Sequence, residues 1–223
     1  MTVKDILNLV IPENFGSDED GEETSSIEDV YDQLDNSVQT TYGASKFIIF
    51  IDDKTVVKIP FNGCFWWDEE YERNKKYEDN WRFDYFINEN YCEIEAAVYD
   101  KAVEAGVEKF FASTQYYGKT KNNVPVYVSE RVFTFFDNAR VRENTDKISE
   151  DSWSRAKELK NDFRVYISEE WLARAIEFYG KVMVDKLVKF ILDENIRDLH
   201  SDNIGFREDG SPVILDYSSY DEN

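Results

Sequence analysis

The sequence predicts an α+β protein whose N-terminal part is rich in β-strands and whose C-terminal part is mainly helical. Three observations carry this prediction: short β-rich segments dominate residues 37–136, a long segment with helical periodicity covers residues 168–195, and two short apolar segments close the chain. Strands that come first and helices that follow are typical of proteins in which the two kinds of element are segregated.

The first strands are expected as a hairpin. Residues 46–51 (KFIIFI) and 55–60 (TVVKIP) are rich in β-branched and aromatic residues, and a turn with two aspartates separates them. This pattern is typical of two antiparallel strands. Two further strands are expected at residues 110–117 and 125–136, so the sequence predicts an antiparallel sheet.

Helical segments are recognised by the spacing of their apolar residues. Tyr91, Ile94, Val98 and Ala102 fall on one face of a predicted helix over residues 91–105. Ser168, followed by two glutamates, is a start signal for a long helix that we expect to continue to about residue 195. A closing hairpin follows, with strands at 204–206 and 213–215 and a turn between them.

These elements divide the chain into three predicted regions. Residues 1–36 are expected to hold a short helix and an acidic flexible segment, NFGSDEDGEETSS. Residues 37–136 are expected to form the sheet with one helix. Residues 137–223 are expected to form the helical region, beginning with a polar loop at 138–151 and ending in the hairpin.

Charge and composition exclude some partners. The 223 residues include 47 acidic and 26 basic side chains, which gives a formal net charge of −21. Nucleic acids and anionic membranes attract clustered lysine and arginine, so we expect neither as a direct partner. Cys64 and Cys92 form no disulfide framework, and no segment reaches the ~20 apolar residues of a membrane span. We therefore expect a cytoplasmic protein.

The most informative segment is Ile196-Arg197-Asp198-Leu199-His200-Ser201-Asp202-Asn203. It resembles the kinase catalytic loop H-R-D-L-x-x-x-N, and its Asp-Leu-His-x-x-Asn form is closest to the aminoglycoside phosphotransferase and choline kinase branch. Asp216, which ends the apolar segment Ile214-Leu215, lies 13 residues after Asn203 and resembles the metal-binding aspartate of D-F-G. The resemblance implies a kinase-like two-lobe fold, with an antiparallel-sheet N-lobe and a reduced helical C-lobe.

The same resemblance implies a role for each of these residues. Asn203 and Asp216 would bind Mg²⁺ together with the phosphates of ATP, since Mg²⁺ prefers oxygen ligands. Asp198 would accept or orient the proton of the attacking hydroxyl. Lys58, in Thr55-Val56-Val57-Lys58, resembles the lysine of V-A-I-K and would contact the α- and β-phosphates.

Lys58 is expected to pair with a glutamate on the helix at residues 91–105. Glu93 and Glu95 compete for this role, and Glu95 is preferred because it lies beside the apolar face of the predicted helix. The phosphate-covering loop is expected around Gly43 and Ser45, where the sequence has one glycine instead of the G-x-G-x-x-G pattern. Backbone groups from Glu130 to Val132 are expected to meet adenine, an assignment that rests on position in the chain.

Three differences from the kinase pattern affect the functional prediction. Ile196 replaces the usual histidine, Tyr217-Ser218 replaces Phe-Gly, and the sequence given stops seven residues after Asp216, so a kinase-like domain truncated after the metal-binding aspartate is expected. The preferred hypothesis is an ATP- and Mg²⁺-dependent phosphotransferase acting on an unidentified hydroxyl acceptor. The alternative is a weak or inactive pseudokinase that binds a partner protein, with its acidic surface as the candidate interface.

Overall fold

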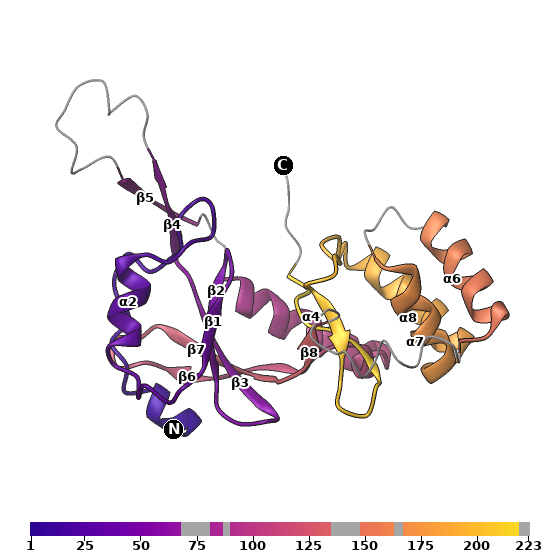
Figure 1. Cartoon of the computed structure of the whole chain (residues 1–223), viewed down its shortest axis with the longest axis horizontal. Helices are drawn as coiled ribbons and strands as arrows, with labels where there is room; N and C mark the ends of the chain where they lie inside the picture. Colours follow the sequence, from indigo (N-terminus) through magenta and orange to yellow (C-terminus); the bar gives the residue numbers. More distant parts are fainter. Residues whose placement is uncertain (68–80, 87–89, 135–147, 163–166, 219–223) are drawn as a thin grey trace. The chain divides into compact units, whose positions relative to one another are not determined.

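A computed structural model gives the structure of residues 1–67, 81–86, 90–134, 148–162 and 167–218. Two compact units make up the chain (Figure 1): the first contains Met1–Glu93 and Thr114–Ser129, and the second contains Ile94–Ser113 and Glu130–Asn223. The domain boundaries expected after residues 36 and 136 stay predictions.

The first unit is built on a five-stranded antiparallel sheet in the order β1-β2-β3-β7-β6. Its strands are β1 (Thr40–Tyr42), β2 (Lys46–Phe50), β3 (Thr55–Pro60), β6 (Thr114–Lys119) and β7 (Pro125–Glu130). Strands β2 and β3 pair from Lys46 opposite Pro60 to Phe50 opposite Val56, which confirms the predicted first hairpin. The alternation of buried apolar residues places the core of this unit on the sheet.

Two short helices and a second hairpin complete the first unit. Helices α1 (Val3–Ile6) and α2 (Ser25–Tyr31) place Ile6, Ile27 and Val30 in the core. Strands β4 (Gly63–Trp67) and β5 (Trp81–Tyr85) form a hairpin that extends away from the five-stranded sheet (Figure 1). A Cβ on Gly16 would lie 2.0 Å from the Gly63 oxygen, so this close approach of two chain segments requires glycine.

Helices form most of the second unit. These are α4 (Tyr91–Ala105), whose first three residues belong to the first unit, the 3₁₀ helix η1 (Glu108–Phe110), α6 (Glu150–Asp162), α7 (Glu169–Tyr179) and α8 (Lys181–Asp193). Helix α7 packs against both α6 and α8. A small antiparallel sheet in the order β10-β9-β8 completes the unit, with β8 (Phe133–Thr134), β9 (Ile204–Phe206) and β10 (Pro212–Ile214).

The structure confirms a mixed α+β protein with antiparallel sheets, and it corrects three predicted elements. The strand expected at residues 125–136 is two strands, β7 and β8, which belong to different sheets. The long helix expected over residues 168–195 is two helices, because Gly180 has a φ of 84° that interrupts helical geometry between α7 and α8. The strand expected at residues 110–117 begins only at Thr114, because Glu108–Phe110 is a 3₁₀ helix. Ser168 does cap α7, where its side chain accepts the Trp171 N–H.

Candidate functional site

The closing hairpin brings the two ends of the predicted magnesium motif together. Strands β9 and β10 pair with Ile204 opposite Ile214. One residue before β9, the Asn203 carbonyl accepts the N–H of Leu215 at 2.8 Å and that of Asp216 at 3.4 Å. Asn203 and Asp216 are therefore neighbours at the open end of the hairpin, although 13 residues separate them in the sequence.

Asp198 joins this pair through the Asn203 side chain. Asn203 Nδ2 donates to the Asp198 carbonyl at 2.8 Å and to Asp198 Oδ2 at 3.2 Å. The neighbouring Leu199 and Ile196 are 0% and 1% exposed, so the core fixes the segment from which Asp198 projects. The structure thus gathers Asp198, Asn203 and Asp216, three of the predicted site residues, in the second unit; we call them the catalytic-loop cluster.

His200 lies beside the catalytic-loop cluster and contacts two aspartates. Its Nε2 is 3.5 Å from Asp198 Oδ1, and its Nδ1 is 3.6 Å from Asp202 Oδ2. The Asp202 N–H donates to Nδ1 at 3.2 Å, and Asn203 Nδ2 lies 3.2 Å from Nε2. These contacts hold the imidazole against the loop on both sides of its ring.

Residues after Asp216 hold its carboxylate in place. Asp216 Oδ1 accepts the Ser218 hydroxyl at 2.9 Å and the Ser218 N–H at 3.4 Å. Between them, Tyr217 is 1% exposed, and its hydroxyl donates to the Ala112 carbonyl at 2.7 Å. The Tyr217 ring also packs edge-on against Phe111, with centroids 5.0 Å apart. Tyr217 therefore anchors this segment in the core, and Ser218 holds the Asp216 carboxylate.

The donor set of the catalytic-loop cluster fits a magnesium ion that is shared with phosphates. Because Nδ2 of Asn203 faces Asp198, its Oδ1 is the amide atom left to act as a ligand, and it accepts no hydrogen bond from any residue that the structure describes. One amide oxygen and nearby carboxylates are a usual set for Mg²⁺ that keeps several ligands from water and phosphate. Within the described ranges, no three His, Cys, Asp or Glu side chains are placed to hold a metal by themselves.

Lys58 and Glu95 are both buried, each in its own unit. Lys58 lies in the middle strand of the five-stranded sheet, opposite Ile48, and is 5% exposed. Glu95 is 0% exposed on α4, whereas Glu93 is exposed. Lysine and glutamate are rarely buried without a specific role or partner. Lys46 is 4% exposed as well, so burial is compatible with the predicted roles of Lys58 and Glu95 and does not by itself distinguish Lys58.

Gly43 and Ser45 lie in the turn that joins β1 to β2. The Gly43 N–H donates to the Lys46 carbonyl at 3.1 Å, and a Cβ at this position would meet nothing within 4 Å. Ser45 is buried, and its carbonyl accepts the Phe61 N–H at 2.9 Å. The turn is therefore a hairpin turn with space for any residue at position 43, and its phosphate-covering role stays a prediction.

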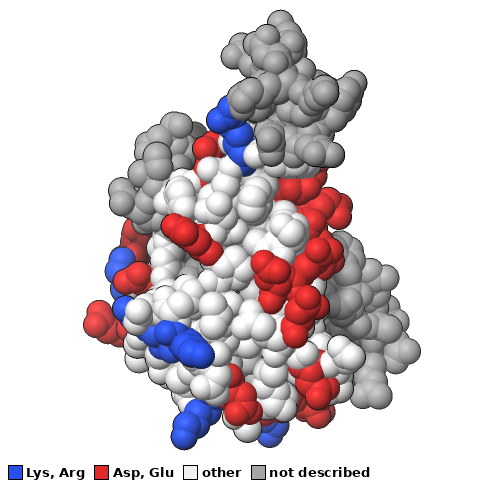
Figure 2. Space-filling view, turned by 90° about the vertical axis from the view of Figure 1, so that its left-hand side faces the viewer, with Lys and Arg blue, Asp and Glu red and all other residues white. Residues whose placement is uncertain are grey.

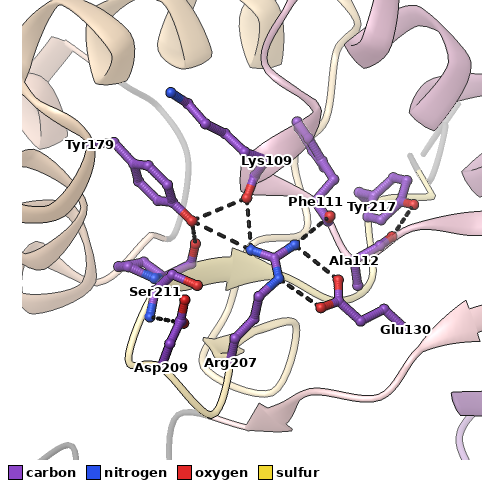
Figure 3. Close-up of polar contacts among 10 residues, drawn as sticks. Lys109, Phe111, Ala112, Glu130, Tyr179, Arg207, Asp209, Ser211 and Tyr217 are labelled. Carbon is purple, nitrogen blue, oxygen red and sulfur yellow. Dashed lines mark hydrogen bonds and ion pairs between the residues drawn. The ribbon is translucent and has the colours of Figure 1, made fainter. Parts of the chain in front are cut away.

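Glu130 belongs to a polar network that the sequence did not predict (Figure 3). Arg207, at the end of β9, donates from Nε to Glu130 Oε1 at 2.7 Å and from Nη2 to Oε2 at 2.9 Å. The same guanidinium donates to the Lys109 carbonyl at 2.8 Å and to the Phe111 carbonyl at 3.1 Å. We call these residues, together with Tyr179, the Arg207 cluster.

Glu130 and Val132, whose backbone groups were expected to meet adenine, lie in the segment that joins the Arg207 cluster through Glu130. The Glu130 N–H already donates to the Ser113 carbonyl at 3.0 Å, so this group is engaged within the second unit. Val132 is half-buried between β7 and β8. Their predicted contact with adenine stays a prediction, and the side chain of Glu130 has a structural role as the partner of Arg207.

Burial and hydrogen bonding shift the pKa values of Arg207 and Tyr179. Burial acts to lower the pKa of Arg207, and the hydrogen bonds and charge of Glu130 outweigh it, so the pKa is raised. Burial raises the pKa of Tyr179, whose hydroxyl donates toward the Lys109 and Pro212 carbonyls at 3.1 and 3.0 Å. The arginine is therefore permanently charged and the tyrosine neutral at physiological pH. No short motif signals this network, because its members come from four separate segments.

The surface supports the acidic character expected from composition. On the face in Figure 2, acidic side chains outnumber basic ones and gather mainly along one side. None of the described helices is long and apolar enough to cross a membrane. Comparison with models of protein families, with curated proteins and with solved structures finds no match to this chain.

Proposed function

We propose that the chain is a phosphotransferase of the kinase-like type that uses Mg²⁺ and ATP to phosphorylate a hydroxyl group. One observation supports the proposal: Asn203 bonds the Asp198 carboxylate through its side-chain amide and the backbone of Asp216 through its main-chain carbonyl. An amide and two carboxylates at these spacings are the set that the D-x-x-x-x-N and D-F-G motifs supply in kinases. Asp198 makes no ion pair with lysine or arginine within the described parts of the chain, which supports a role toward a ligand.

Each member of the catalytic-loop cluster has a separate role in this proposal. Asn203 Oδ1 and the Asp216 carboxylate would hold Mg²⁺, which neutralises phosphate charge when it is bound. Asp198 would orient the acceptor hydroxyl and take its proton as the oxygen forms a bond to the γ-phosphorus and ADP leaves. Ser218 and Tyr217 would hold the Asp216 carboxylate in position, because one bonds the carboxylate and the other fixes the backbone.

Lys58 and Glu95 extend the proposal to the nucleotide. The strand position of Lys58 is the context in which a V-A-I-K lysine is expected, and its ammonium would act as a point charge on the α- and β-phosphates. Glu95 would orient that lysine. Lys58→Met keeps the length and apolar character of the side chain and removes the charge, so it is the direct test of this role.

Nucleotide binding is tested first, by thermal unfolding with and without Mg·ATP. We expect the wild type to gain several degrees in Tm at millimolar Mg·ATP, and we expect the gain to disappear with EDTA and in Asp216→Ala. Asp193→Ala, which changes an exposed aspartate at the end of α8, is the matched control and should keep the gain. A wild type without any metal-dependent shift would contradict the proposed nucleotide site.

Catalysis is tested by ADP formation in Asp198→Asn. The amide keeps the size of the side chain but cannot take a proton, so we expect nucleotide binding to persist and turnover to fall about 10²- to 10⁴-fold. Equal background rates in the wild type and the variant, with Mg·ATP binding intact, would reject the enzyme and favour a pseudokinase that binds a partner protein. The acidic surface in Figure 2 is the candidate interface for that alternative.

A further inference from the structure

The first unit contains a pocket that the proposed phosphotransfer does not use. Its volume is about 390 Å³, which lies within the range of small-molecule sites. Aromatic side chains form much of its wall, namely Phe15, Phe61, Tyr85 and Phe86. Tyr85 is 56% exposed, so an aromatic ring is available at this surface. None of the candidate catalytic residues lines the pocket.

Hydrogen bonds hold the walls of the pocket in place. Asn62 Oδ1 accepts the Phe15 N–H at 2.9 Å, and Asn62 Nδ2 donates to the Glu13 carbonyl. The Tyr85 hydroxyl donates to Asn14 Oδ1 at 2.8 Å. These bonds join the segment before α2 to the end of β3 and to the β4–β5 hairpin. The aromatic walls are therefore fixed before any ligand binds, which lowers the entropic cost of binding.

Asn90 is a second lining amide, and each of its two polar atoms bonds the protein. Its Oδ1 accepts the Glu93 N–H at 3.1 Å at the start of α4, and its Nδ2 donates to the Tyr127 hydroxyl at 3.0 Å. Burial raises the pKa of Tyr127 to about 12, so this phenol stays neutral. One donor and one acceptor of each of Asn62 and Asn90 thus hold the framework of the pocket.

Asn123 differs from these two amides. It lies in the β6–β7 turn with a φ of 70°, its side chain is exposed, and its amide makes no hydrogen bond to the described residues. A carboxamide is both a donor and an acceptor, so a ligand with a complementary donor and acceptor could pair with it. No other side-chain amide on the described wall is open in this way.

Charge decides which aromatic ligands fit. No side chain with a charge lines the described wall of the pocket, so a charged group inside it would lose water without gaining a partner of opposite charge. The net charge of −21 adds repulsion for any anion that approaches the surface. The fixed aromatic walls, the open amide and the absence of cationic lining all favour an uncharged aromatic ligand.

We propose that this pocket binds a small, uncharged aromatic molecule that carries a carboxamide or an equivalent donor–acceptor group. The ring lies against Tyr85 and Phe86, where edge-to-face contacts add to the burial of apolar surface. The polar group pairs with the Asn123 amide. This site shares no residue with the catalytic-loop cluster, so the proposal stands whether or not the chain is a phosphotransferase.

The test uses indole-3-acetamide and indole-3-acetate, which have nearly the same shape and differ in charge. Isothermal titration calorimetry on the full chain should give saturable binding of the amide, with a Kd of about 0.1–1 mM for a ligand of this size. The carboxylate should bind at least about tenfold more weakly, because it enters an uncharged pocket of an acidic protein. No saturable binding of the amide, or equal affinity for both compounds, would overturn the proposal.

Variants locate the binding site. Tyr85→Ala removes part of the wall and should weaken indole-3-acetamide at least about fivefold. Tyr116→Ala removes a tyrosine of the same 56% exposure that lies outside the pocket, so affinity should stay within about twofold. Asn123→Gly keeps the positive φ and removes the amide, so affinity should fall about threefold to tenfold. Unchanged affinity in both Tyr85→Ala and Asn123→Gly would place the ligand elsewhere and reject the site.

Discussion

The two ends of the β9–β10 hairpin differ in how their charged side chains are paired. At the turn end, Arg207 forms two hydrogen bonds with Glu130 and two more with backbone carbonyls. At the open end, Asp198 lies within reach of the Asn203 amide and of His200, and it forms no pair with lysine or arginine among the described residues. At the turn end, Arg207 and Glu130 therefore neutralise each other. At the open end, the Asp198 carboxylate pairs with no lysine or arginine of the described residues.

This difference separates stability from function within one element. Paired charges that bond backbone groups of several segments hold those segments together, and removing one member leaves the others unsatisfied. A carboxylate that pairs with no lysine or arginine, as Asp198 does among the described residues, is typical of sites that bind a cation or phosphate-bound metal. Substitutions at the turn end should therefore destabilise the protein, whereas substitutions at the open end should alter ligand binding.

The largest effect is expected for Arg207→Ala. The change leaves the Glu130 carboxylate and the carbonyls of Lys109 and Phe111 without their donor, so the free energy of unfolding should fall by about 2–4 kcal/mol. Arg207→Lys should recover little of this loss, because an ammonium cannot reproduce the planar fork of bonds. Urea unfolding monitored by circular dichroism gives the measurement.

Arg155→Ala is the matched control for this prediction. The Arg155 side chain is 25% exposed against 22% for Arg207, and it also binds a carboxylate in two contacts, to Asp185 at 2.6 and 3.2 Å. Its partners are side chains on helices α6 and α8 and no backbone carbonyl. We expect a loss below about 1 kcal/mol. Similar losses in Arg155→Ala and Arg207→Ala would contradict the special importance of the Arg207 cluster.

A smaller loss of stability is expected for Tyr217→Phe. The Tyr217 hydroxyl donates to the buried Ala112 carbonyl, and phenylalanine keeps the ring contact with Phe111 while it removes the bond. The free energy of unfolding should fall by about 1–2 kcal/mol, measured by the same urea titration. Because Asp216 precedes this residue, Mg·ATP should also bind more weakly. An unchanged nucleotide affinity would show that the anchor is dispensable for the open end.

Asp198→Asn is expected to act in the opposite direction on stability. The substitution removes a negative charge at the open end and keeps an oxygen that can accept the Asn203 Nδ2 bond. The free energy of unfolding without ligand should stay the same or rise by up to about 1 kcal/mol, because like-charge repulsion decreases. Differential scanning calorimetry without nucleotide measures this change. A loss of stability comparable to that of Arg207→Ala would erase the contrast between the two ends.

The open end of the hairpin could be predicted from the sequence, and the turn end could not. A turn between two short apolar strands brings Asn203 and Asp216 together whatever surrounds them, so local pattern was sufficient. The Arg207 cluster needs carbonyls from residues 109 and 111 and a carboxylate from residue 130, and no local pattern encodes their meeting. Tertiary contacts between distant segments cannot be predicted from local patterns in a single sequence.

The same reasoning explains the errors in secondary structure. The apolar spacing on either side of Gly180 is helical, so the periodicity continues across a glycine that ends α7 with a positive φ. Helix α6 was not predicted, and its first two residues were expected in a polar loop, because its sequence is mostly polar; Trp153, Ala156 and Leu159 are its apolar contacts with the core. Burial of Glu95 rather than Glu93 followed from helical geometry alone, and the structure has this arrangement.

The smallest expected effect concerns Asp209, an exposed carboxylate in the turn itself. The Ser211 hydroxyl and then the Ser211 N–H, at 2.9 Å, lower the pKa of Asp209 below its ordinary value. Since the folded-state pKa is lower than the unfolded one, the stabilisation is present above the unfolded pKa and is lost as pH falls through the folded pKa. Ser211→Ala removes the hydroxyl and keeps the N–H, so NMR titration should show the Asp209 pKa rising part of the way to its ordinary value. The associated stability lies well below about 1 kcal/mol because solvent screens the group.

An Asp209 pKa that does not move in Ser211→Ala would mean that the backbone alone organises the turn, and that side-chain pairing at this end is confined to the Arg207 cluster.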